Sequence, residues 1–285
     1  MSTKNTPASA AAPLPVLLPF RIEPTRLGTP RLAPMHALLF GAGLVLLAGS
    51  AWAQAVSVQL SPLEVIIKWA PLLLSGFAFN ILISMIAMAI GTGAGLGVGL
   101  GMLSHNTLLA RFCWALTQFF RNAPWLVLLF FVMFLVPFQI TVFGVRIPLP
   151  DWLKATVGFS LPVMANVAEI VRGAVRSVPS TQWEAAESLA FTPRQTMWRI
   201  ILPQCVKRML PPWMNLYSLV TMATVQASIV GVSEMLTLTA QVHTAEGGRP
   251  ELFAPLYGFA MLCFFLYCYP IDRFTARLER RFHIR

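Results

Sequence analysis

Long apolar runs separated by short polar segments make up most of the chain beyond residue 34. The runs lie near 35–55, 77–102, 125–143, 155–171, a stretch ending near 232, and 251–270. An α-helix needs about 20 apolar residues to cross the hydrocarbon core of a bilayer, where every backbone polar group must be satisfied internally. The pattern therefore predicts an all-α integral membrane protein with five core transmembrane helices and an extra N-terminal hydrophobic helix.

The two segments at the N-terminus differ in composition. Residues 1–34 are rich in Pro, Ala, Ser and Thr and carry basic side chains, which predicts a disordered basic tail. Residues 35–60 are either a retained membrane helix or a signal-like segment, because small residues precede Ala55 as they do at a signal-peptidase site. A basic region of this length is long for a signal peptide, so we favour the retained helix.

Residues 61–75 mix charged and aromatic side chains with aliphatic ones, which predicts a separate helix lying at the outer membrane interface. The next apolar run carries glycines at every second position from Gly91 to Gly101. They form two series with small-xxx-small spacing, 91/95/99 and 93/97/101, and we expect both to let neighbouring helices approach closely. A dinucleotide-binding loop is the alternative, but no strand precedes the glycines.

Residues 181–203 form the one segment that is neither apolar nor a plain polar tail. Thr181 with Glu184, and Thr192 with Gln195, each match a capping box. In such a box the hydroxyl accepts from a backbone N–H and the Glu or Gln side chain reaches back to the cap. The two boxes predict two short helices joined by an elbow at 191–193. An ordinary amphipathic loop between two membrane helices is the alternative.

Composition supports a membrane protein. Hydrophobic residues make up 56% of the 285 positions and charged residues only 11%, with a mean hydropathy of +0.68, whereas soluble domains carry about 25% charged residues. In the expected topology Lys68, Arg146, Lys154 and Arg249 lie outside, which leaves 17 of the 21 Lys and Arg inside. Basic residues kept on the cytoplasmic side set membrane topology, so the net charge of +10 needs no nucleic-acid partner.

No cofactor, metal or catalytic site is predicted. The four cysteines lack CxxC spacing and the four histidines are scattered, so neither a redox pair nor a metal site is recognisable. The chain also lacks a G-x-x-x-x-G-K-[ST] phosphate loop, so any ATP hydrolysis that drives it must occur on another chain. We therefore expect no enzyme activity; a membrane enzyme is the alternative class, disfavoured because no nucleophile–base set is visible.

The segment 181–203 resembles the EAA loop of ABC-importer permeases. The match consists of Glu184-Ala185-Ala186, then Ala190 and Phe191, and further on Ile200-Ile201-Leu202-Pro203. In that family the loop docks a cytoplasmic ATPase, so the resemblance implies a coupling loop at 173–205 with these ATPase-coupling residues: Glu184, Ala185, Ala186, Ala190 and Phe191. The family usually has Gly where this chain has Ala190, and we take the alanine to indicate helical backbone with negative φ there.

Further motifs resemble those of the histidine/glutamine-type permeases, the polar amino acid branch of the ABC importers. They are Arg121-x-x-Pro124, Ala168-Glu169-x-x-Arg172-Gly173, Ile201-Leu202-Pro203-Gln204, Pro211-Pro212, Asn215 and Gly231-Val232-x-Glu234, within a permease domain at 61–285. The resemblance implies a multi-pass permease subunit of the bacterial inner membrane that moves an amino acid or related small polar solute into the cytoplasm by alternating access. A non-conducting regulatory or scaffold subunit is the alternative.

The resemblance also implies three partners: an ABC ATPase subunit, a periplasmic or extracellular solute-binding protein, and a second permease. Candidate pathway residues are the polar side chains within the apolar runs, which are expensive in a bilayer and usually functional. They are Asn80, Asn166, Glu169, Arg172, Asn215, Thr224 and Gln226. Each alternatively bridges neighbouring helices, and Glu169 alternatively forms a structural ion pair with Arg172 one turn away.

Four positions depart from the family pattern. Ala123, Leu128, Met222 and Ala223 stand where relatives usually carry polar groups. Leaving the charged ends of an amino acid without partners in a low-dielectric cavity is costly. The second permease is therefore either identical, with a less typical ligand, or different, and we favour a heterodimer in which the other permease carries most of the recognition.

Overall fold

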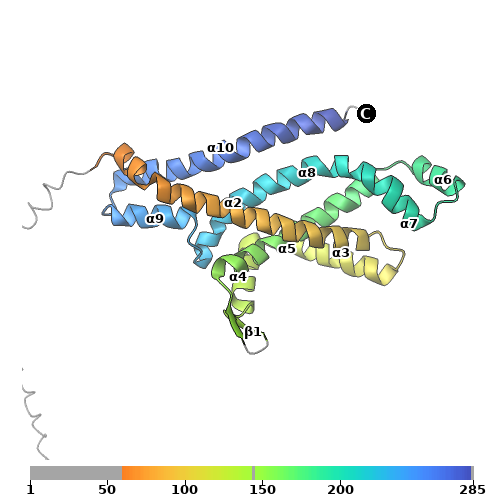
Figure 1. Ribbon diagram of the computed structural model, residues 1–285, viewed down its shortest axis with the longest axis horizontal. Helices are drawn as coiled ribbons and strands as arrows, with labels where there is room; N and C mark the ends of the chain where they lie inside the picture. The colour runs from red at the N-terminus through yellow and green to blue at the C-terminus, as the bar shows by residue number, and fades with distance from the viewer. Residues whose placement is uncertain (1–59, 143–144, 284–285) are drawn as a thin grey trace, which may run out of the picture. The chain divides into compact units, whose positions relative to one another are not determined.

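The computed structural model of the chain describes residues 60–142 and 145–283. The expected basic tail at 1–34 and the hydrophobic segment at 35–59 lie outside these ranges. The described part is almost entirely helical and includes one two-stranded sheet (Figure 1). Its elements are α2 (Pro62–Gly101), α3 (Thr107–Asn122), α4 (Trp125–Leu135), β1 (Gln139–Val142), β2 (Val145–Pro148), α5 (Asp151–Arg176), α6 (Ser180–Ser188), α7 (Pro193–Gln195), the π-helix η1 (Thr196–Ile201), α8 (Leu202–Ala223), the 3₁₀ helix η2 (Thr224–Val230), α9 (Met235–Ala245) and α10 (Pro250–His283).

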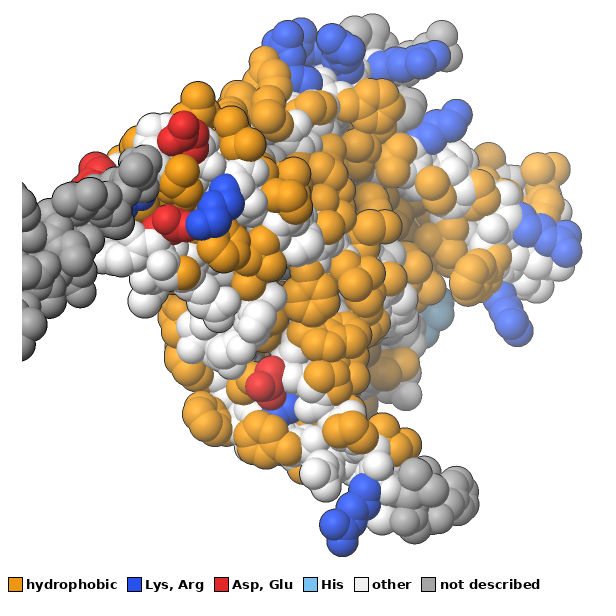
Figure 2. All heavy atoms as spheres, turned by 60° about the vertical axis from the view of Figure 1, so that its left-hand side comes forward, with side chains coloured by type: hydrophobic (Ala, Val, Ile, Leu, Met, Phe, Trp, Pro, Cys, Tyr) orange, Lys and Arg blue, Asp and Glu red, His pale blue; other side chains and the backbone are white. Residues whose placement is uncertain are grey.

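Helices α2 and α10 are each long and apolar enough to cross a bilayer. Two bent pairs, α3 with α4 and the segment 193–230 with α9, pass the same test when each pair counts as one broken span, which gives up to four spans among the described residues. Hydrophobic side chains cover most of the face shown in Figure 2, with few charged side chains between them. The all-α membrane class expected from the sequence is confirmed.

The prediction of a separate interfacial helix at 61–75 is wrong, because α2 runs unbroken from Pro62 to Gly101. Ser61 and Glu64 form a capping box at its start: the Ser61 N–H donates to the Glu64 carboxylate at 2.7 Å. Lys68 Nζ and Trp69 Nε1 both donate to the Glu246 carboxylate at 2.7 Å. These contacts satisfy the polar groups that the sequence pattern assigned to a surface helix, so the helix continues past them.

The same contacts lower the pKa of the Glu246 carboxyl below its usual value. The hydrogen bond from Lys68 contributes most to this shift and the hydrogen bond from Trp69 contributes next. A carboxyl whose pKa is lowered by folding stabilises the folded state above its unfolded pKa. That contribution is lost only as the pH falls through the lowered value. The contact between α2 and the end of α9 is therefore intact at neutral pH.

One of the two glycine series of α2 packs closely against α5. The series 91/95/99 is buried, and a Cβ at Gly95 would lie 2.6 Å from the carbonyl oxygen of Met164. A Cβ at Gly93 or Gly97 would meet nothing within 4 Å in the described chain. The prediction of close helix approach is thus confirmed for the first series and for Gly101, where a Cβ would lie 2.5 Å from the Cys113 Sγ atom, and it stays a prediction for Gly93 and Gly97.

The third apolar run does not form one helix to 143. Helix α4 ends at Leu135, and the strands β1 and β2 follow as an antiparallel pair with Ile140 opposite Ile147. The centre of the Phe138 ring lies 3.5 Å from Lys154 Nζ. Lys154 is buried and its Nζ is also 3.0 Å from the Asp151 carboxylate. The base of the hairpin is therefore held against the first turn of α5.

The fifth apolar run is broken at its far end. Helix α8 gives way to η2, and Gly231 adopts a φ of 90°, a conformation that glycine reaches without steric cost. Helix α9 follows after a bend of 52°. The expected outer segment at 233–250 thus contains a helix, which joins α2 and α10 in a buried cluster that includes Leu73, Met235 and Leu252.

Candidate functional site

A cavity of about 1030 Å³ is lined chiefly by α5, α8 and α10. Three of the predicted pathway residues line it: Asn166, Glu169 and Asn215. The other charged side chains along its wall are Arg121, Lys207, Arg208, Asp272 and Glu279. The lining thus offers three basic and three acidic groups among apolar helices, an arrangement that can bind a small solute carrying both charges.

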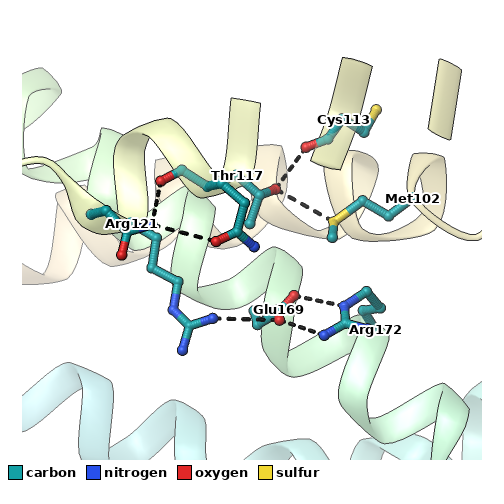
Figure 3. Close-up of polar contacts among 8 residues, drawn as sticks. Met102, Cys113, Thr117, Arg121, Glu169 and Arg172 are labelled. Carbon is teal, nitrogen blue, oxygen red and sulfur yellow. Dashed lines mark hydrogen bonds and ion pairs between the residues drawn. The ribbon is translucent and has the colours of Figure 1, made fainter. Parts of the chain in front are cut away.

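Glu169 lies between two arginines (Figure 3). Arg172 Nε donates to Glu169 Oε2 at 2.7 Å, and Arg172 also reaches the other carboxylate oxygen. Arg121 Nη1, at the end of α3, is 3.4 Å from Glu169 Oε1. The pairing with Arg172 that the spacing predicted is present, and the contact with Arg121 adds a link between α3 and α5.

Most of the charged lining was not singled out from the sequence. Arg208 Nη1 donates to the backbone oxygen of Ser177 at 2.6 Å and to its hydroxyl at 2.7 Å, which joins α8 to the end of α5. The α8 lining includes positions 207, 211, 215 and 219, a spacing of four that places side chains on one helix face. This stripe was the available signal, and it begins at the basic pair Lys207-Arg208 rather than within the apolar run.

Arg172, which pairs with Glu169, does not line this cavity, and neither do Asn80, Thr224 and Gln226. Asn80 and Thr224 are fully buried and hydrogen-bonded to each other at 3.0 Å. The Oε1 atom of Gln226, in η2, is buried without a hydrogen-bond partner among the described residues. In this conformation the cavity ends before it reaches Asn80, Thr224 and Gln226, and the pathway role of all four residues stays a prediction.

The segment between α5 and α8 contains one separate short helix, α6, and the predicted elbow, whereas the second predicted helix begins at α7 and continues without a break through η1 into α8. The capping box at Thr192 is confirmed, since its N–H donates to Gln195 Oε1 at 2.9 Å and its hydroxyl accepts from the Gln195 N–H. The box at Thr181 is wrong. Helix α6 is capped at Pro179, which has the extended backbone of a cap residue, so Thr181 already lies inside the helix.

The predicted coupling residues differ in exposure. Glu184, Ala185 and Ala190 are exposed, Phe191 is half-buried, and Ala186 is buried. Two large apolar side chains missed by the sequence analysis, Leu189 and Trp198, are 71% and 58% exposed. Exposed apolar groups beside polar ones are typical of protein-binding surfaces, so the loop can dock a partner protein.

The backbone at Ala190 corrects the expectation of negative φ. Its φ is 59°. The Ala190 N–H donates to the Glu187 oxygen at 2.8 Å and the Phe191 N–H to the Ala186 oxygen at 3.1 Å, the two bonds of a Schellman motif. This motif places one residue in the left-handed region, usually glycine. The hydrogen bonds that end α6 therefore impose a positive φ on Ala190, and alanine occupies a position suited to glycine.

Replacing Ala190 by glycine should raise the stability of the permease, because left-handed backbone costs an L-residue roughly 1–2 kcal/mol, offset in part by the greater chain entropy of unfolded glycine. We expect a net gain of about 1 kcal/mol, measured as a higher midpoint of thermal unfolding in detergent. Ala185→Gly is the matched control, and it should lose about 1 kcal/mol because Ala185 is exposed and helical. A lower midpoint for Ala190→Gly would contradict the left-handed conformation.

Comparison with known proteins gives similarity over most of the chain. A probable amino-acid ABC transporter permease protein, YckA of Bacillus subtilis, is 32% identical over 212 residues, 74% of this chain and 89% of its own length. A probable glutamine ABC transporter permease protein, GlnP of Bacillus subtilis, is 28% identical over 58% of this chain and 73% of its own length. The crystal structure of an amino acid ABC transporter with histidines has a similar fold, with a TM-score of 0.67 at 23% identity over 79% of this chain and 100% of that one.

The family described as binding-protein-dependent transport system inner membrane component matches residues 91–284. That range contains the cavity lining, the Glu169 cluster and the loop with its elbow. The chain belongs to this family and is a permease subunit of an ABC importer.

Proposed function

We propose that this permease imports an amino acid or a closely related small polar solute by alternating access. The observation that carries the proposal is the cavity, which brings charges of both signs together between apolar helices. Of the lining charges, Glu169 lies within an apolar run, where an ionisable group is costly in a bilayer and usually marks a solute pathway. The names of the similar permeases, which refer to amino acids and glutamine, support the same substrate class.

The charges of the cavity suit the two ends of a zwitterion. Both oxygens of Glu169 already accept hydrogen bonds from Arg172, so this carboxylate has little capacity left for a ligand ammonium in this conformation. Asp272 lines the cavity and forms no ion pair among the described residues. We assign the ammonium to Asp272 and the carboxylate to Lys207, because charge-assisted hydrogen bonds are the strongest available there.

The partners follow from the same proposal. A separate ATPase hydrolyses ATP and docks on α6 and the elbow, where Glu184, Leu189 and Trp198 are exposed. A solute-binding protein outside a bacterial inner membrane delivers the ligand, and a second permease completes the pathway. No metal or cofactor is needed for this role.

A heterodimer of permeases remains a proposal without support from the geometry. The sequence argument rested on four apolar residues at positions where relatives carry polar groups, and none of the four lines the cavity. Leu128 is buried in the core, and Met222 lies along a separate apolar groove of about 490 Å³. The cavity carries its own charged lining, so a pair of identical permeases also has groups for a zwitterion.

The test is reconstitution. The chain is expressed with its ATPase, purified, placed in proteoliposomes and supplied with the binding protein and labelled amino acids. We expect uptake that requires ATP and the binding protein, together with ligand-stimulated ATP hydrolysis. Assembly with the ATPase but no uptake of any amino acid would favour a scaffold role. A transport-competent complex that contains only this permease would rule the heterodimer out.

A further inference from the structure

Helix α9 is attached to α2 at both of its ends. At the C-terminal end of α9, Glu246 accepts hydrogen bonds from Lys68 and Trp69 of α2. At its start, the backbone of Met235 lies against Gly76, where a Cβ would come within 2.9 Å of the Met235 Cα atom. Gly76 therefore lets the first turn of α9 approach the α2 backbone closely, and the next turn of α2 carries Asn80.

Asn80 is the centre of a buried set of hydrogen bonds. Its Oδ1 accepts from the Met235 N–H at 3.1 Å, and its Nδ2 donates to Glu234 Oε2 at 2.9 Å and to Thr224 Oγ1 at 3.0 Å. The other oxygen of Glu234 accepts from the Thr237 N–H at 2.9 Å. Asn80, Thr224 and Glu234 are all 0% exposed. The Asn80 amide thus joins α2, η2 and α9, and the buried carboxylate is hydrogen-bonded through both oxygens.

This set lies beyond one end of the cavity. The α8 lining runs from Lys207 to Leu219, and Thr224 and α9 come after it in the chain. Polar contacts between α2 and α8 lead towards the same place: Trp213 donates to Thr92 at 2.8 Å, and Thr221 to Ser84 at 3.2 Å. The hydrogen bonds of Asn80 are the last of this row. They lie past the end of the lining opposite the basic pair at 207–208.

We propose that Asn80 and Glu234 are positioning residues that hold α9 on α2 and so keep the outer end of the translocation pathway closed. The proposal rests on the proposed transport function. In this arrangement the cavity communicates with the inner side, where Lys207 and Glu279 lie. Solute entry from outside then requires α9 to leave its seat or to move together with α2.

Asn80 donates the hydrogen bond and Glu234 accepts it. A test can therefore exchange the donor and the acceptor between the two positions. Asn80→Asp alone sets two carboxylates against each other, and Glu234→Gln alone sets one NH₂ group against another. Leaving such buried groups unsatisfied is costly. The double variant Asn80→Asp with Glu234→Gln restores a donor–acceptor pair with its direction reversed. The new amide at position 234 donates to the new carboxylate at position 80 and still accepts from the Thr237 N–H, and that carboxylate still accepts from the Met235 N–H. The Thr224 hydroxyl, which accepts from Asn80 and donates to the Thr221 oxygen in the parent, must turn to donate to the new carboxylate.

The readout is the side from which the cavity can be reached. A single cysteine is introduced at Leu219, with Cys113, Cys205, Cys263 and Cys268 replaced by alanine. Intact cells that express the full complex are treated with a membrane-impermeant thiol reagent. We expect little labelling of Leu219→Cys in the parental permease, several-fold faster labelling in either single variant, and a return to the parental rate in the double variant.

Lys68→Ala is the matched control, because it removes an exposed contact at the other end of α9, of a kind that contributes little. It should keep the parental labelling rate. If the single variants fail to accumulate in the membrane, Glu234→Asp provides the test, since it keeps the charge but withdraws the carboxylate from Asn80. It should then label several-fold faster than the parent.

The two proposals fail in different ways. Absence of uptake by the parental complex would overturn the transport function. Uptake by the parent, together with parental labelling in the single variants, would overturn the role of Asn80 and Glu234. A double variant that labels as fast as the single variants would also overturn it, because the restored hydrogen bonds would then not be what closes the outer end.

Discussion

Replacing Gly95 by alanine is expected to reduce sharply the amount of folded permease in the membrane. The new Cβ would lie 2.6 Å from the Met164 carbonyl oxygen and 2.7 Å from the Val167 Cβ atom. The first of these is backbone, so it cannot move aside as a flexible side chain would. Extra methylene groups in a well-packed core typically cost about 1–3 kcal/mol, and α2 must also separate from α5, its main packing partner.

Gly97→Ala is the matched control on the same helix. A Cβ there meets nothing within 4 Å, and alanine favours helix over glycine by about 1 kcal/mol. We expect normal or higher levels of this variant, measured by size-exclusion chromatography of a fluorescent fusion and by the thermal unfolding midpoint. Equal levels of Gly95→Ala and the parent would contradict the close packing of α2 on α5.

Local features of the fold were predictable where the interaction lies within a few residues. The capping box at Thr192 is an example, since the residues that satisfy it are its own neighbours. The box at Thr181 has the same pattern but fails because Pro179 supplies the extended backbone two residues earlier. Similarly, the left-handed conformation of Ala190 results from the hydrogen bonds that end α6. The identity of the residue, an alanine, gives no sign of that conformation.

The choice between the two glycine series needed the position of α5. Both series have the same spacing, so the sequence shows two surfaces on which helices can approach closely and does not show which neighbour lies against each glycine. In the structure Gly95 faces α5, whereas Gly97 faces no part of the described chain. Spacing within one helix carries no information about the neighbour that fills each face.

The same reason limits the prediction of the cavity. Asn166 and Asn80 both interrupt apolar runs, and sequence alone gives them equal standing as pathway residues. The structure separates them. Asn166 lines the cavity. The side chain of Asn80 is instead hydrogen-bonded to Glu234, Thr224 and the backbone of Met235. A polar side chain within a membrane helix thus indicates that a partner exists, and tertiary packing decides whether that partner is solute or protein.

Reversing the charge of Glu184 is expected to uncouple the permease from its ATPase while leaving the permease folded. Glu184 is exposed on α6, and its side chain forms no ion pair among the described residues. Since α6 is capped at Pro179, Glu184 is not part of a capping box, and Glu184→Lys removes no structural contact. Surface substitutions of this kind usually change stability by less than about 0.5 kcal/mol.

The loss should therefore appear in assembly and transport. A lysine at this position reverses the charge that the partner surface meets, and like-charge contacts across an interface can cost several kcal/mol. We expect parental levels of Glu184→Lys in the membrane, little co-purified ATPase and little uptake. Glu251→Lys is a charge reversal at the exposed start of α10 that also removes a 3.7 Å ion pair with Arg249. It should retain both, because an exposed pair of this kind contributes little. If Glu184→Lys bound the ATPase and transported at the parental rate, α6 would not be the docking helix.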